Sequence, residues 1–147
     1  MIYVTLLTAT LAATTLMTAF SYFVSYIFKE PYKEPLLLSI LLHPTDQSLL
    51  NRFIGWMIHY LIGLLFVVIY YLLLNVSWID ANWMSGTIYG LLIGFVGVVS
   101  WHYIFKIPSR TVKLNHKAYY LQLVIAHLIF GITMVCCFKA MHFVEAV

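Results

Sequence analysis

The chain has 147 residues, of which 63% are hydrophobic and 9% are charged. Soluble domains average about 45–50% apolar and about 25% charged residues, so this composition excludes a soluble globule and a disordered chain. The eight Lys and Arg residues form no basic stripe, which argues against a nucleic-acid partner. The sequence therefore predicts an integral membrane protein with a single transmembrane domain over residues 1–147.

Four uncharged apolar segments are long enough to cross a bilayer. A transmembrane helix needs about 20 apolar residues, because the hydrocarbon core is about 30 Å thick. Backbone groups inside lipid have no water to bond, so each spanning segment must be helical. The predicted spans are residues 2–28, 53–74, 85–105 and 118–138. Their mostly short connections predict an all-α fold, an antiparallel four-helix bundle.

The connection between the first two spans contains two prolines and a short apolar stretch. Pro31 and Pro35 each disfavour helix at the residue before them, so we expect the start of this connection to be non-helical. Residues 36–43 are mostly apolar but too short to cross. They predict a short helix that lies in the interface, with a brief dip into the membrane as the alternative. Thr45 or Asp46 is then the expected N-cap of the second span.

The charged residues lie outside the predicted spans. Lys and Arg concentrate in the connections 29–52 and 106–117, and only Lys139 lies on the other side. The excess of positive charge in cytoplasmic loops places these two connections in the cytoplasm and both termini outside, with the inverted topology as the alternative. Ion-coupled transporters and proton pumps carry acids within the membrane. With Glu30 and Glu34 assigned to a loop, energised transport is not expected.

Small and hydroxyl-bearing residues line particular faces of the spans. Small residues let transmembrane helices approach closely, and the third span carries two overlapping small-xxx-small motifs. The hydroxyls of the first span fall within an arc of about 80° at 100° per residue, which predicts a face turned toward protein. The alternative is a solute path. The predicted packing residues are Gly55, Gly63, Gly86, Gly90, Gly94, Gly131, Thr10, Thr14 and Thr18.

Three histidines lie at a similar depth in three different spans. At about 1.5 Å per residue, His59, His102 and His127 all fall in the predicted cytoplasmic half. His59 has Gly55 four residues before it and Gly63 four residues after it, so we expect its ring to point toward the bundle axis. The side on which His102 lies is less clear from its spacing. A convergence of His59 and His127 is therefore the firmer expectation.

These histidines allow three interpretations. His59 and His127 could ligate a haem b iron, as in bundle cytochromes. His59, His102 and His127 together could hold a transition metal such as zinc or copper. In the structural interpretation the imidazoles are neutral and only form hydrogen bonds across helices.

Short motifs carry a family resemblance. The pattern Gly-Trp-x2-His-x3-Gly at residues 55–63 and the pattern His-x2-Phe-Gly at residues 127–131 resemble those of YagU-like small multi-pass bacterial inner-membrane proteins. The Thr-Leu-Met-Thr stretch at residues 15–18 is similar too. The resemblance covers parts of three helices. It implies a multi-pass protein of the bacterial inner membrane and assigns no catalytic or binding residue.

The function expected from these features is a non-catalytic membrane protein that acts through protein or lipid contacts. The spans offer no nucleophile beside a base, and little of the chain lies outside the predicted membrane. Its expected partners are the lipid bilayer and other membrane proteins, as an accessory or structural subunit. The alternatives are a redox protein that binds haem or a metal, and passive conduction of a small solute.

Overall fold

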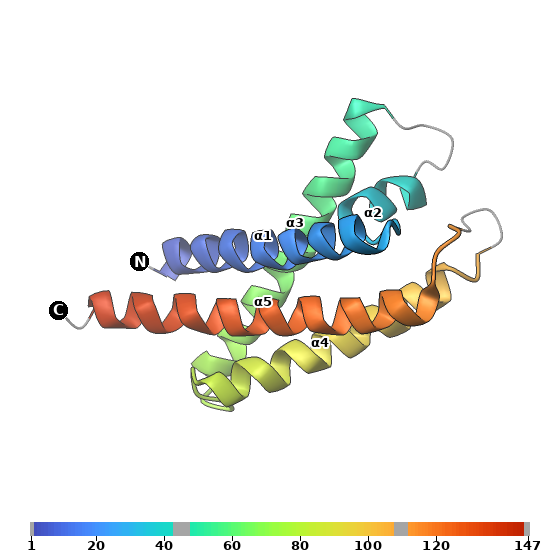
Figure 1. Ribbon diagram of the computed structural model, residues 1–147. Coiled ribbons are helices and arrows are strands. Elements are labelled where there is room, and N and C mark those ends of the chain that lie inside the picture. The colour runs from blue at the N-terminus through green and yellow to red at the C-terminus, as the bar shows by residue number, and fades with distance from the viewer. Residues whose placement is uncertain (1, 43–47, 108–111, 146–147) are drawn as a thin grey trace.

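The computed structural model describes residues 2–42, 48–107 and 112–145, with side chains as far as Met141. Figure 1 presents the chain, whose described part is helical and contains no strand. Its helices are α1 (Ile2–Phe28), α2 (Glu34–Leu42), α3 (Leu49–Asn75), α4 (Trp83–Ile104) and α5 (His116–Glu145). The predicted all-α bundle is confirmed.

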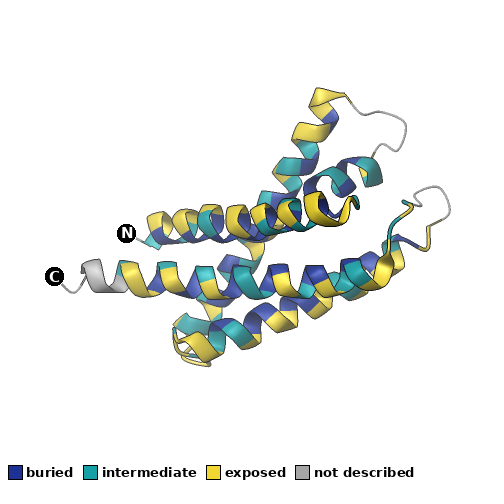
Figure 2. Cartoon of the chain, in the orientation of Figure 1, coloured by how far each residue is buried: buried dark blue, intermediate teal, exposed yellow. Residues whose placement is uncertain are grey.

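Among the described residues, four helices are long and apolar enough to cross a membrane: α1, α3, α4 and α5 as far as Met141. Each of the four predicted spans overlaps one of these helices. Their outward faces expose large apolar side chains such as Leu11, Leu61 and Phe95. Exposed residues recur along all of these helices, as the yellow stretches in Figure 2 show. This surface suits the acyl chains of a bilayer, and the helices support a multi-pass membrane protein.

Within this bundle the long helices are not all aligned. α1 and α5 lie side by side in opposite directions, α4 lies along α5, and α3 crosses this group steeply (Figure 1). The main helix pairs in the described part of the chain are α4 with α5, α1 with α5, α2 with α3 and α1 with α3. α3 and α4 are joined near their connection, where the Tyr89 hydroxyl donates to the Phe66 carbonyl at 2.7 Å. From there they diverge.

Polar caps define two of the helix starts. At the start of α3, the Ser48 side chain accepts a hydrogen bond from the backbone N–H of Asn51. This N–H is one of the backbone donors that have no partner within the helix. The residues predicted for this role, Thr45 and Asp46, lie outside the described residues. At the start of α4, Asn82 and Ser85 form a reciprocal capping box.

α2 differs from the predicted interfacial helix in its start and in its surroundings. It begins at Glu34, two residues before the predicted start, and Pro35 occupies its first turn. That position suits proline because its missing N–H would have no partner within the helix there. Leu37 and Ser39 are buried, and Asn51 Nδ2 of α3 donates to the Ser39 carbonyl at 3.1 Å. α2 therefore folds back into the bundle against α3.

The core consists of two apolar clusters. One, near the two termini, includes Val67, Tyr70 and Phe130. The other includes Leu37, Trp101 and Tyr119 and lies toward the other end of the bundle. Besides these clusters the bundle buries a set of polar residues, called the polar layer below: Thr14, Thr18, Ser21, Glu34, His59, Gln122 and His127. This polar layer holds the candidate site.

Candidate functional site

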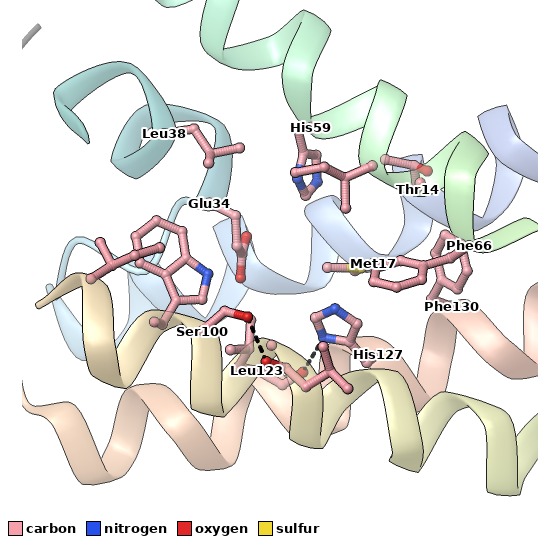
Figure 3. A pocket seen from close by; sticks show the side chains of 16 residues that line it. Thr14, Met17, Glu34, Leu38, His59, Phe66, Ser100, Leu123, His127 and Phe130 are labelled. Atoms are coloured by element: carbon pink, nitrogen blue, oxygen red, sulfur yellow. Dashed lines mark hydrogen bonds between the residues drawn. The ribbon is translucent and has the colours of Figure 1, made fainter. Parts of the chain in front are cut away.

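A cavity of about 170 Å³ lies at the polar layer, and all five helices contribute to its wall. Most of the wall is apolar, with Met17, Phe66 and Phe130 at one side (Figure 3). The polar side chains in the wall are Thr14, Glu34, His59, Ser100 and His127. A few polar groups in an apolar cavity are typical of a small-molecule site, where they orient the ligand.

The structure brings His59 and His127 to this one cavity. His59 comes from α3 and His127 from α5, and their rings lie on opposite sides of the space between them (Figure 3). They are 6% and 7% exposed. Gly97 of α4 leaves room for the ring of His127, because an added Cβ there would lie 3.2 Å from Cε1.

The hydrogen bond of His127 shows which of its ring nitrogens can accept a hydrogen bond from a molecule in the cavity. Its Nδ1 lies 2.8 Å from the carbonyl oxygen of Leu123. A carbonyl oxygen can only accept, so Nδ1 carries the proton. In the neutral ring, Nε2 then has a lone pair and no proton, and His127 contributes an acceptor to the cavity.

The hydroxyl stripe of α1 determines the tautomer of His59. Thr18 Oγ1 lies 2.9 Å from His59 Nε2 and 2.6 Å from the carbonyl oxygen of Thr14. A hydroxyl has one proton, and the carbonyl can only accept it. Thr18 therefore accepts from the Nε2–H of His59, which leaves Nδ1 of His59 as an acceptor.

Glu34 is the principal cavity residue that the sequence did not indicate. Its side chain is 2% exposed and lines the cavity. Ser21 Oγ donates to Glu34 Oε1 at 2.8 Å, and Gln122 Nε2 donates to the same oxygen at 3.2 Å. The second oxygen, Oε2, is buried without a hydrogen-bond partner. Burial away from water raises the pKa of Glu34 to about 7, against the opposing effect of these hydrogen bonds.

The prediction that Glu34, the residue before Pro35, belongs to a non-helical loop is therefore wrong, because α2 begins at Glu34. The acid precedes a short apolar segment, and that segment packs inside the bundle instead of along its surface. Gln122 was overlooked as well, although an amide within a predicted span is a visible signal in the sequence. In lipid such a side chain needs a partner, and here it binds Ser21 and Glu34.

His102 does not join the other two histidines. It is exposed, and its Nδ1 lies 3.3 Å from the hydroxyl of Tyr120, away from the cavity wall. Across the described ranges, no three His, Cys, Asp or Glu side chains are placed to hold a metal ion. The geometry therefore does not support the proposed three-histidine metal site.

The cavity also limits the haem interpretation. An apolar cavity of about 150 Å³ accommodates one benzene ring, so about 170 Å³ is too small for a macrocycle of four pyrroles. His59 and His127 face each other across this space, but the space does not admit the porphyrin between them.

The predicted packing residues lie at helix contacts. A Cβ on Gly131 of α5 would clash with the Gly86 carbonyl of α4, and a Cβ on Gly90 would lie 2.7 Å from the His127 carbonyl. A Cβ on Gly94 would likewise lie 3.2 Å from the Cβ of His127. On α3, a Cβ on Gly55 would clash with the Pro35 carbonyl. A Cβ on Gly63 would clash with the Thr14 hydroxyl.

The hydroxyls of α1 are turned into the bundle. Thr10, Thr14 and Thr18 are all buried. Thr10 donates to the Leu6 carbonyl at 2.7 Å, so its hydroxyl, like that of Thr18, bonds its own helix. The Thr14 hydroxyl differs, because it lines the cavity and is buried without a partner.

The cavity opens between α3 and α4. Ile62 of α3 and Val96 of α4 both belong to its wall, yet they are 38% and 52% exposed. Ser100, one turn beyond Val96, is exposed as well. This is the side on which α3 and α4 diverge (Figure 1), so the opening lies on the flank of the bundle.

Comparison with known proteins yields no relative: the chain matches no family model, no curated protein and no solved structure. The resemblance to YagU-like inner-membrane proteins therefore stays a prediction. The residues of the cavity therefore provide the only indication of what it could bind among the described parts of the chain.

Proposed function

We propose that this chain is a non-catalytic membrane protein that binds a lipid-soluble molecule with a compact polar head. The observation that carries this proposal is the buried Oε2 of Glu34, which has no hydrogen-bond partner, in the wall of the cavity. A buried polar group without a partner costs about 1–3 kcal/mol. A ligand that bonds this oxygen recovers that cost on binding.

The position of the opening favours a ligand that arrives through the bilayer. α3 and α4 are both long and apolar enough to cross a membrane, and the cavity opens between them, beside Ile62 and Val96. A molecule dissolved among the acyl chains reaches Glu34 by this route without crossing water. Its apolar tail then remains outside, in lipid.

The size of the cavity limits the polar head. Drug-sized ligands occupy about 300–1,000 Å³, whereas this cavity holds about 170 Å³. The space suits one ring or a comparably small group. The proposal thus retains the expected role through lipid contacts and specifies the kind of lipid-soluble partner.

Of the other functions considered, passive conduction has less support than ligand binding. Conduction along the hydroxyls of α1 requires a row of groups free to bond a passing solute. Those of Thr10 and Thr18 bond backbone carbonyls, and that of Thr14 alone among these three has no partner. The role of accessory subunit in a larger complex stays a prediction, which co-migration of native material with other membrane proteins would test.

Photo-crosslinking of the full chain in lipid nanodiscs tests the proposal. The probe is a long-chain alcohol that carries a diazirine on its tail, and unlabelled alcohol serves as the competitor. We expect saturable, competable labelling on α3 and α4 near Ile62 and Val96. Labelling that never saturates would contradict a binding site.

A matched pair of variants ties the labelling to the cavity. Val96→Trp covers the opening from an exposed position, so labelling should fall several-fold. Val99→Trp adds the same ring on the same helix at a residue that is 38% exposed and absent from the wall, so labelling should persist. Equal labelling of the two variants would locate the probe elsewhere.

A further inference from the structure

Glu34, His59 and His127 offer hydrogen-bond acceptors to the cavity, whereas the unpartnered Thr14 hydroxyl in the wall can donate as well as accept. His127 Nε2 has a lone pair, because Nδ1 donates to the Leu123 carbonyl. Glu34 Oε2 has no partner. Above the pKa of about 7 the side chain is a carboxylate, which can only accept, so the competition below is run at a pH above this value. His59 also retains its acceptor, because its Nε2–H is used by Thr18. A ligand that satisfies these groups must supply protons to them.

The side chains that carry these acceptor atoms reach the cavity from different sides. Figure 3 places Glu34 of α2 at one end of the cavity, while His59 and His127 lie on opposing walls beyond it. A head with a single donor can satisfy one of these groups. A head with donors at two opposite positions can satisfy Glu34 and a histidine together.

The apolar wall favours a flat ring between these donors. Phe66, Phe130 and Trp101 line the cavity with Met17, and aromatic and thioether groups pack well against ring faces and edges. The volume of about 170 Å³ exceeds the roughly 150 Å³ that accommodates benzene. One substituted six-membered ring therefore fits.

We propose that the cavity binds a quinol, a lipid-soluble ring with two opposed hydroxyl groups, in preference to the corresponding quinone. Each hydroxyl donates a hydrogen bond, one toward Glu34 and one toward a histidine acceptor. A quinone carbonyl offers only lone pairs, which repel the lone pair of His127 Nε2. This inference rests on the proposed function and specifies its ligand class.

Competition against the diazirine alcohol tests the preference on the full chain in nanodiscs. The competitors are a decyl-substituted hydroquinone kept reduced, its quinone, and its dimethyl ether. We expect the quinol to displace the probe at concentrations roughly ten-fold lower than the other two, which corresponds to one net hydrogen bond. Equal displacement, or stronger displacement by the quinone, would overturn the inference.

Two variants test whether His127 causes the preference for the quinol over the quinone. His127→Leu should reduce the ratio between quinol and quinone toward one, whereas His102→Leu, at an exposed histidine outside the wall, should leave it unchanged. Both competitors are measured on the same sample of each variant, so a lower fraction of folded protein does not change the ratio between quinol and quinone. An unchanged ratio in His127→Leu would overturn the assignment of this acceptor.

The outcomes separate the two proposals. Saturable labelling that Val96→Trp abolishes, combined with no preference for the quinol, would keep the binding function and reject the ligand class. Tighter binding of decylamine than of the quinol would reject it as well, in favour of a cationic head. A lack of saturable labelling would reject the binding function itself.

Discussion

The hydroxyl of Thr18 lies 2.9 Å from Nε2 of His59 and joins α1 to α3. Both residues are buried, and the Thr18 proton goes to the Thr14 carbonyl. The hydroxyl stripe of α1 therefore does more than permit close packing. It orients an imidazole at the cavity and determines which of its nitrogens is protonated.

Replacing Thr18 with Val should destabilise the protein. The change keeps the shape of the side chain but leaves the Nε2–H of His59 buried without an acceptor, at a cost of about 1–3 kcal/mol. Thermal unfolding in detergent measures the effect. Thr18→Ser retains the hydroxyl and serves as the control, so equal melting of the Val and Ser variants would exclude this role.

Stability should depend on pH through Glu34. Burial raises its pKa from 4.5 to about 7, so the folded protein binds a proton that the unfolded chain has released between these values. The stabilisation is complete below about pH 4.5 and is lost as the pH rises through about 7, by roughly 3 kcal/mol at most. Melting temperatures across this range measure the loss.

Glu34→Gln should remove that part of the pH dependence, because the amide does not titrate. The groups facing Glu34 are Tyr22 of α1, Tyr119 of α5 and the two histidines of the cavity, and they are unchanged in this variant. Glu30→Gln is the control in the preceding connection, because Glu30 does not line the cavity. An unchanged pH profile in Glu34→Gln would assign the titration to another group.

Gly131→Ala should weaken the contact between α4 and α5. The added methyl group would clash with the carbonyl of Gly86 and lie 2.9 Å from the Cα of Gly90. Backbone cannot move aside cheaply, and overpacking costs about 1–3 kcal/mol. Gly97→Ala is the control, because its Cβ would meet the far edge of the His127 ring at 3.2 Å. Equal melting of the two variants would contradict the close backbone contact.

The predicted orientation can be tested by labelling single cysteines in a Cys136→Ser, Cys137→Ser background. Lys117→Cys lies in the connection expected in the cytoplasm, and Trp78→Cys lies in the connection expected outside. A membrane-impermeant maleimide should label only Trp78→Cys in intact cells and both variants after lysis. The reverse pattern would establish the inverted topology.

The sequence by itself determined the helices and the inward direction of two histidines. Long uncharged segments must be helical in lipid, because the backbone can bond only itself there. Glycines four residues on either side of His59 marked the helix face that packs against other helices, and the ring of His59 does face the cavity. Both signals are local, so they can be read along one helix.

Only the tertiary structure decided the position of Glu34 and the place of the opening. Whether a short segment such as α2 lies along a surface or folds into the bundle depends on its contacts with α3, including that between Asn51 and Ser39. Those contacts join residues from different helices, and no periodicity within either helix encodes them. The separation of His102 from the other histidines and the divergence of α3 from α4 have the same origin. Both depend on how neighbouring helices pack, and not on the hydropathy of either one.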